Sequence, residues 1–212
     1  MATYESLIKI TGAVGDLVFY TLNGKNVVRK KSGFNKAAFK KDPSYEKVRQ
    51  NSSEFGHCSK IGKIIRNTLE VYIRKAGDPL LYQKFAKVMT TIKDLDMISG
   101  RGKRTVENGL KTEEGKKLLR EFQLGTFPNI SDCIRIEDQI LYQSEDCSAD
   151  KAVIMTIKLD SENYSTEYAE EIISWNQQQQ RPFKKYFSEN DVLLYFMILK
   201  NDHDEITHMG FV

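Results

Sequence analysis

The order of hydrophobic and polar positions predicts β-structure at the start of the chain. Residues 7–31 contain an alternation at Ile8 and Ile10, followed by the dipeptide Asn23-Gly24. Both central residues of a type I′ turn need positive φ, which Asn and Gly adopt most readily. The runs that flank this dipeptide are rich in β-branched and aromatic residues, at 17–20 and 27–29. We therefore expect a β-hairpin closed by Asn23-Gly24.

A helical period replaces this pattern in the middle of the chain. Asp42-Pro43 is a typical helix start, and Gly77 followed by Asp78-Pro79 is a typical stop. Between and beyond these signals, apolar residues recur at three- and four-residue spacing. The spacing predicts three helices, at roughly 43–75, 79–98 and 105–123.

From Gly125 onward the chain returns to short apolar runs typical of strands. We expect strands at 133–136, 140–142, 152–157, 192–199 and 206–212. The pattern of residues 165–176 fits a helix and a strand equally, and Gln177 to Gln180 is expected to be a loop. The predicted fold class is α+β, with an N-terminal β-hairpin, a central bundle of about three helices and a C-terminal antiparallel β-sandwich-like domain. The predicted domains are 1–124 and 125–212.

Composition adds a marked charge asymmetry to this picture. The 212 residues are 40% hydrophobic and 29% charged, as in an ordinary folded protein, with a net charge of +3. Residues 1–124 carry 25 Lys and Arg against 13 Asp and Glu, whereas residues 125–212 carry 7 against 16. The two parts therefore have net charges of +12 and −9. Such a division indicates a polyanionic partner, or two parts of opposite sign that attract one another.

The first thirty residues carry a recognisable pattern. It consists of Ile10-Thr11-Gly12, Gly15-Asp16-Leu17-Val18-Phe19-Tyr20, Asn23-Gly24-Lys25 and Val28-Arg29-Lys30-Lys31. This pattern resembles the start of uncharacterised Bacteroidota proteins that also have a β-rich C-terminal domain ending in a hairpin. The resemblance implies a hairpin followed by a β-rich end, and it implies no activity.

Location and redox state follow from what the sequence lacks. The start has no basic region followed by an apolar run, so no secretory signal is expected. No stretch approaches the roughly 18–20 apolar residues that span a bilayer. The three cysteines, Cys58, Cys133 and Cys147, are widely spaced and predict neither a disulfide framework nor a zinc site. We expect a cytoplasmic protein with reduced thiols and no membrane partner.

No catalytic, cofactor or metal constellation stands out in the sequence. Gly12-Ala13-Val14-Gly15 and Gly100-Arg101-Gly102-Lys103 lack the Gly-Lys-Ser/Thr continuation of a phosphate loop. His57 and Cys58 are adjacent on a predicted helix, where side chains point about 100° apart. The remaining polar groupings fit a solvated surface: Asp94/Asp96, Glu113/Glu114, Glu170/Glu171, and His203 and His208 near Asp202, Asp204 and Glu205. We therefore expect no enzyme activity, no cofactor and no metal.

One basic segment is the candidate contact site. Within it, eight cations alternate with the aromatic residues Phe34, Phe39 and Tyr45, an arrangement suited to phosphate neutralisation and base stacking. The eight are Arg29, Lys30, Lys31, Lys36, Lys40, Lys41, Lys47 and Arg49. Three interpretations remain open: a solvated connector, a protein-docking surface and a nucleic-acid contact.

These features favour a non-enzymatic structural or assembly subunit that makes protein–protein contacts. The partner is expected to be another copy of the chain or another protein, with the basic N-terminal region meeting the acidic C-terminal region. The alternative function is a nucleic-acid-associated protein of a phage or mobile element.

Overall fold

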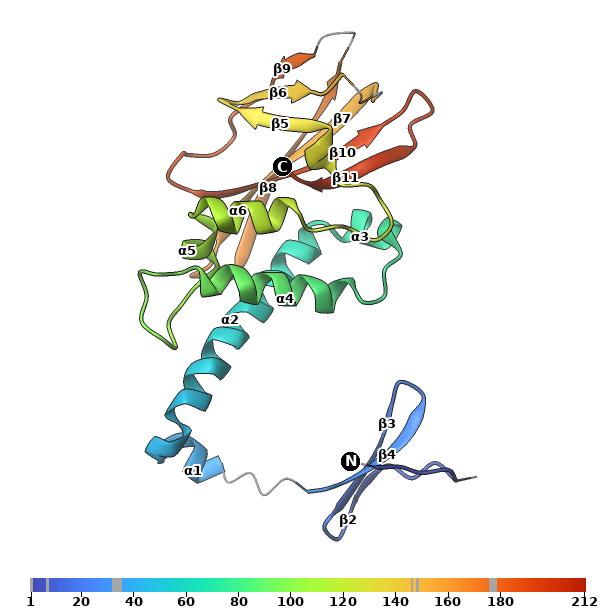
Figure 1. Cartoon of the computed structure of the whole chain (residues 1–212), viewed down its shortest axis with the longest axis vertical. Helices are drawn as coiled ribbons and strands as arrows, with labels where there is room; N and C mark the ends of the chain where they lie inside the picture. Colours follow the sequence, from blue (N-terminus) through green and yellow to red (C-terminus); the bar gives the residue numbers. More distant parts are fainter. Residues whose placement is uncertain (1, 7, 32–35, 146, 148, 176–178) are drawn as a thin grey trace. The chain divides into compact units, whose positions relative to one another are not determined.

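The computed structural model describes residues 2–6, 8–31, 36–145, 147, 149–175 and 179–212. It is an α+β protein with antiparallel sheets, as the sequence predicts. Contacts along the chain divide it into two compact units, Met1–Glu46 and Lys47–Val212, which are described separately (Figure 1). The domain boundary expected between residues 124 and 125 falls inside the second unit.

The first unit is built around the predicted hairpin. Asn23 and Gly24 have φ values of 50° and 77°, as a type I′ turn requires, so the hairpin is confirmed. Its two strands form the centre of a four-stranded sheet of order β1-β4-β3-β2. The strands are β1 (Ala2–Thr3), β2 (Gly12–Val14), β3 (Leu17–Leu22) and β4 (Lys25–Lys30).

The strand expected at Ile8 and Ile10 does not form. β2 pairs with β3 and β1 pairs with β4, so the described residues at 8–11 have no strand beside them. Both isoleucines are exposed. Two alternating apolar residues predict a strand only where a partner strand is available to complete the ladder.

A short helix and a capped turn complete the first unit. They are α1 (Lys36–Lys41) and the 3-10 helix η1 (Pro43–Tyr45). Asp42 caps η1, because its Oδ1 accepts a hydrogen bond from the Ser44 N–H at 2.8 Å, and Pro43 occupies the first helical position. The helix start predicted at Asp42-Pro43 is therefore confirmed.

The helices of the second unit are more broken than the sequence suggests. The helix expected over 43–75 is interrupted at Leu69, and the helix expected over 105–123 is interrupted before Glu113. Thr112 caps the restart, since its Oγ1 accepts from the Gly115 N–H at 3.0 Å. The helices are α2 (Glu46–Thr68), α3 (Glu70–Ala76), α4 (Leu81–Asp94), α5 (Val106–Leu110) and α6 (Glu113–Arg120).

Two antiparallel sheets make up the rest of the second unit. The larger has the order β11-β10-β7-β8. Its edge strand β8 comes from the segment whose pattern fits both helix and strand, of which residue 176 lies outside the described residues. Gln180, expected in a loop, lies in β9, while residues 177–178 lie outside the described residues. The larger sheet contains β7 (Lys151–Asp160), β8 (Ser165–Ser174), β10 (Val192–Lys200) and β11 (Ile206–Phe211). The smaller contains β5 (Ile134–Glu137), β6 (Ile140–Gln143) and β9 (Gln180–Pro182), with the 3-10 helix η2 (Ile130–Asp132) preceding it.

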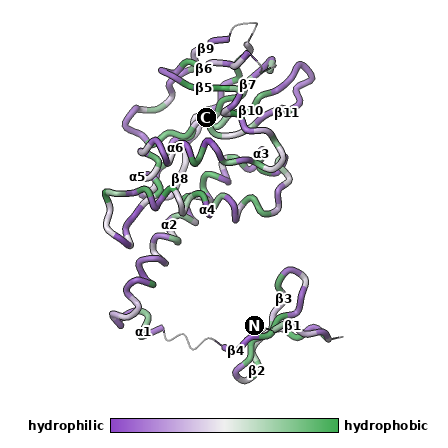
Figure 2. Tube along the Cα trace, in the orientation of Figure 1, coloured by the Kyte–Doolittle hydropathy of each residue, from purple (hydrophilic) through white to green (hydrophobic). Residues whose placement is uncertain are grey.

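The larger sheet is the middle of three layers. Alternate residues of β7 face opposite cores: Val153 and Met155 pack with the helices, whereas Ile154 packs with the smaller sheet. Figure 1 shows the helices on one face of this sheet and β5, β6 and β9 on the other. Because both faces are covered, β7 and β10 are nearly continuous apolar runs, as the colours of Figure 2 show. Among the described residues, no helix combines the length and hydropathy needed to cross a bilayer.

Candidate functional site

The eight predicted contact residues are divided between the two units. Six lie in the first unit, on β4, directly after it, and on α1, and two lie at the start of α2. Arg29 and Arg49 are half-buried, and the other six are exposed. Of the interleaved aromatics, Phe39 and Tyr45 pack edge to face with 5.9 Å between ring centroids, and Phe34 lies outside the described residues. The β4 and α1 cations therefore form an exposed basic stretch in the first unit.

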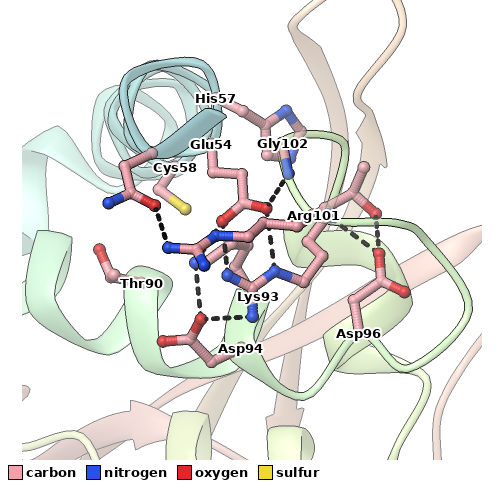
Figure 3. A network of polar contacts seen from close by, with 12 residues as sticks. Glu54, His57, Cys58, Thr90, Lys93, Asp94, Asp96, Arg101 and Gly102 are labelled. Carbon is pink, nitrogen blue, oxygen red and sulfur yellow. Dashed lines mark hydrogen bonds and ion pairs between the residues drawn. The ribbon is translucent and has the colours of Figure 1, made fainter. Parts of the chain in front are cut away.

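A buried charge network that the sequence did not single out lies in the second unit (Figure 3). Its centre is Glu54 of α2, whose side chain is only 2% exposed. Glu54 Oε2 accepts from Lys93 Nζ at 2.8 Å, and Arg104 donates to both carboxylate oxygens at 2.9 and 2.7 Å. The Gly102 N–H donates to Oε1 at 2.6 Å. Asp94 completes the network, lying 2.6 Å from Lys93 Nζ and 2.9 Å from Arg104 Nη1.

The charges of this network balance, and each pKa shift reinforces its charged state. Hydrogen bonds from Arg104 hold the pKa of Glu54 far below its usual range, against the opposing effect of burial. Burial also acts to lower the pKa of Lys93, but its bonds to Asp94 and Glu54 outweigh burial and raise it. The Glu54 bond likewise raises the pKa of Arg104. Glu54, Lys93 and Arg104 are therefore held in their charged forms by one another.

Asp96 fixes the neighbouring loop through hydrogen bonds that it accepts from main-chain N–H groups and from a side-chain amide. Its Oδ1 accepts from the N–H groups of Ile98 and Ser99, at 3.0 and 2.9 Å, and its Oδ2 accepts from the Thr105 N–H at 2.9 Å. The Asn108 amide adds a bond of 3.2 Å. Burial disfavours the charge of Asp96, but these donors outweigh it and hold the pKa well below the usual range.

The two carboxylates together fix the connection between α4 and α5 while its tip remains open to solvent. Asp96 holds both ends of the connection, and Glu54 holds its middle through Gly102. Met97 and Ile98, which directly follow Asp96, are 90% and 82% exposed. We define the loop tip as Met97, Ile98, Arg101 and Lys103, all of which are exposed. A fixed loop base that presents two exposed apolar side chains beside two cations is the strongest candidate for a contact site.

His57 of α2 contacts the start of α5, where its Nε2 has two alternative partners. Its Nε2 lies 3.1 Å from the Val106 N and 3.2 Å from Glu107 Oε2, while its Nδ1 lies 3.4 Å from the Tyr164 hydroxyl. Neutral Nε2 accepts from Val106, whereas protonated Nε2 donates to Glu107. Both carboxylate oxygens of Glu107 are buried and have no other hydrogen-bond partner among the described residues. The arrangement couples α2 to the start of α5.

Cys58, next to His57, packs as a core residue. Its side chain is buried, and its Sγ lies 3.6 Å from the Met89 carbonyl oxygen. Burial raises its pKa to about 11, so the thiol is protonated at neutral pH. Burial also raises the pKa of Cys133, to about 12. All three cysteines are buried, and none of them forms a disulfide in the structure.

The glycines and histidines considered from the sequence for phosphate or metal binding lie in turns or in other contacts. Gly15 belongs to the tight turn between β2 and β3, with φ of 55°. Gly102 directs its N–H at Glu54 instead of at an open phosphate site. His203 is exposed in the turn between β10 and β11, 3.5 Å from Asp202. Within the described part of the chain, no group of three or more His, Cys, Asp or Glu side chains is arranged to hold a metal ion.

The sequence carries one signal for the network, at Glu54. Glu54 precedes Cys58, Ile61 and Ile65 on the same helical face, at four- and three-residue steps. A carboxylate at an apolar position of a periodic helix indicates a buried charge that needs a partner. The partners lie 39 and 50 residues away in sequence, and no pattern along the chain identifies them.

Acid is expected to weaken the fold through these carboxylates. The folded-state pKa values of Glu54 and Asp96 lie below their usual values, so the unfolded chain takes up protons first as pH falls below about 4–5. Their contribution to stability is present above that range and is lost as pH falls towards the folded pKa. The free energy of unfolding should drop by about 1.4 kcal/mol per pH unit for each carboxyl over that interval.

Urea unfolding between pH 7 and pH 3, in low and high salt, tests this expectation. Salt screens the exposed carboxylates but not the buried ones, so the steep fall should persist in high salt. A stability that is unchanged down to pH 3 in high salt would contradict it.

Comparisons with known proteins do not add to this geometry. The chain matches no protein-family model, no curated protein and no solved structure.

Proposed function

We propose that the protein is a non-enzymatic assembly subunit whose copies bind one another through the loop tip. The observation that carries this proposal is the buried network beneath two exposed apolar side chains. Buried ion pairs add little net stability over apolar packing, so the need for a single loop conformation explains the buried Glu54 better than a gain in stability does. A loop that is already ordered loses little conformational entropy when it binds.

The acceptor surface in this proposal is the edge strand β8. One side of its main chain pairs with β7, and no strand lies along the other side among the described residues. Tyr168 and Ile172 are 56% and 69% exposed on this strand, beside the exposed Glu167 and Glu170. An open edge with apolar side chains is a template for association. We define the β8 edge as these four residues.

The loop tip and the β8 edge complement each other in chemistry. Each surface has two exposed apolar side chains and two exposed charges, positive on the loop tip and negative on the β8 edge. On β8, Glu170 lies on the same face as Tyr168 and Ile172, whereas Glu167 lies on the opposite face, 3.4 Å from Lys158. The apolar pairs supply burial, and the exposed charges orient the approach. Because the two surfaces differ, the contact is heterologous and leads to a ring if it closes or a filament if it does not. The net charges of +12 and −9 in the two parts of the sequence support the same arrangement.

Light scattering on a sizing column, at several protein concentrations in low and high salt, tests the proposal. We expect particles larger than a monomer that grow with concentration and shrink with salt. The double substitution Met97→Ser/Ile98→Ser is expected to weaken association at least tenfold, because it removes the apolar contact without touching the buried network. Tyr168→Ser/Ile172→Ser should weaken it to a similar extent.

Leu80→Ser is the matched control for these variants. Leu80 is exposed, apolar and outside both surfaces, so its replacement should leave association unchanged. A monomer at every concentration and salt level contradicts the proposal, as does equal weakening by Leu80→Ser.

Nucleic-acid association is the second candidate function. Lys30, Lys31, Lys36, Lys40 and Lys41 are exposed, and none of them forms an ion pair with a described carboxylate. Unpaired cations of this kind suit phosphate neutralisation. The ratio of absorbance at 260 and 280 nm, recorded in the same experiment, separates the candidates. A monomer that carries nucleic acid favours this second function over assembly.

A further inference from the structure

A pocket of about 550 Å³ lies in the second unit, where the helical layer, the smaller sheet and the end of the larger sheet meet. Its walls come from α5 and α6, from η2 and β5, and from the ends of β10 and β11. Apolar side chains, among them Leu119, Ile134 and Phe211, form most of the lining. The volume falls within the range of roughly 300–1,000 Å³ that is usual for small-molecule sites.

The pocket exists because β10 and β11 differ in length. β10 begins at Val192, but β11 ends at Phe211, which lies opposite Phe196. The last bond between them runs from the Val212 N–H to the Tyr195 carbonyl at 3.0 Å. Main-chain groups face the same side at every second residue of a strand, so those of Leu193 face the side of β10 that β11 does not reach. The pocket therefore combines apolar walls with a main-chain donor and acceptor.

The charged side chains that line the pocket have one sign, and the main-chain carboxylate of Val212 is the one negative group among the described residues beside them. Lys116, Arg120 and Arg135 line it, and no Asp or Glu is among its described lining residues. Lys116 is paired with Glu113 and Arg135 with Glu137, both outside the pocket. Arg120 is half-buried and has no carboxylate within ion-pair distance among the described residues. A half-buried guanidinium without a carboxylate partner favours an anionic ligand.

We infer that this pocket binds a small amphipathic carboxylate. The anionic group binds beside Arg120, which offers the bidentate donors that a carboxylate prefers. The apolar body of the ligand packs on the leucine, isoleucine and phenylalanine side chains that line the walls. A neutral apolar ligand leaves the guanidinium unpaired, and a polyanion without an apolar body leaves the leucine, isoleucine and phenylalanine walls uncovered, so neither satisfies the site as fully. This site is separate from the loop tip and the β8 edge and does not depend on assembly.

Calorimetric titration of the whole protein with octanoate tests the inference, with octanamide as the neutral compound of the same shape. Octanoate is expected to bind saturably with one site per chain and at least tenfold more tightly than octanamide, because only the carboxylate gains a charge-assisted hydrogen bond. Arg120→Gln should reduce octanoate affinity about tenfold and leave octanamide affinity unchanged.

Two further variants make the result specific to this pocket. Ser131 is exposed at the rim, so Ser131→Trp is expected to obstruct the pocket and abolish binding of both compounds while the protein remains folded. Arg74→Gln removes an exposed arginine of α3 that is paired with Glu70, and it should leave binding unchanged. No saturable octanoate binding, equal affinity for octanoate and octanamide, or full binding by Ser131→Trp would each overturn the inference.

Discussion

Replacing Glu54 by Gln is expected to lower the free energy of unfolding by about 3–5 kcal/mol, the range for breaking a buried ion pair from one side. The substitution keeps the size of the side chain but removes its charge. Of the described carboxylates that pair with Lys93, whose side chain is 7% exposed, only the half-exposed Asp94 then remains. Arg104 loses the bidentate partner that fixes the loop. Urea unfolding at neutral pH measures the loss.

A double substitution distinguishes this explanation from a simple loss of packing. Glu54→Met/Lys93→Met removes both buried charges and leaves the Arg104–Asp94 pair in place. Replacing a buried pair by apolar residues of similar volume is often neutral, so the double variant should recover most of the stability that Glu54→Gln loses. A double variant that is less stable than Glu54→Gln would show that charge compensation is not the cause.

An exposed ion pair provides the control for both variants. Glu70 and Arg74 lie one turn apart on α3 with 2.6 Å between Oε1 and Nη2, and both are well exposed. Such a pair contributes about 0.3–0.5 kcal/mol, so Glu70→Gln should change stability only slightly. If Glu54→Gln costs no more than Glu70→Gln, the buried network does not stabilise this fold.

Local chemistry explains which parts of the fold could be predicted. The turn at Asn23-Gly24 follows from the positive φ that these two residues accept, which requires no knowledge of the rest of the chain. The strands β7 and β10 are long apolar runs, because both of their faces are buried. In each case the residues themselves carry the signal.

The edge strand β8 and the break between α2 and α3 were harder to predict from the sequence, because tertiary contacts determine both. In β8, apolar residues and glutamates occur on both faces, since this edge strand is only partly covered, and the alternation is lost. Leu69 is buried at the break between α2 and α3, so the apolar period continues through the break and conceals it. The charge network was missed for a related reason, because its members come from three separate segments.

Replacing Gly109 by Ala is expected to lower the free energy of unfolding by about 3 kcal/mol, at the upper end of the usual cost of overpacking. Gly109 lies on α5, where the helix backbone approaches α4 directly. A Cβ atom at this position would lie 2.0 Å from the Ile92 carbonyl oxygen and 2.7 Å from the Ile92 carbonyl carbon. Because these are main-chain atoms, no side-chain rotation relieves the clash, and α5 must move away from α4. Urea unfolding again measures the effect.

Gly56 provides a matched control within α2. A Cβ atom there would meet no heavy atom within 4 Å, so Gly56→Ala should stabilise the protein by about 0.5–1 kcal/mol through helix propensity alone. Equal stability of the two alanine variants would contradict the close contact between α4 and α5.

The displacement of α5 is also expected to loosen the loop that carries the loop tip. α5 begins at Val106, directly after Thr105, which Asp96 holds through its main-chain N–H. Moving α5 away from α4 pulls Thr105 away from Asp96, so the base of the loop loosens while Met97 and Ile98 remain exposed. Gly109→Ala is therefore expected to weaken self-association under conditions where the variant is still folded, although it changes no residue of the loop tip. Unchanged association in a folded Gly109→Ala variant would show that a fixed loop base is not required for the contact.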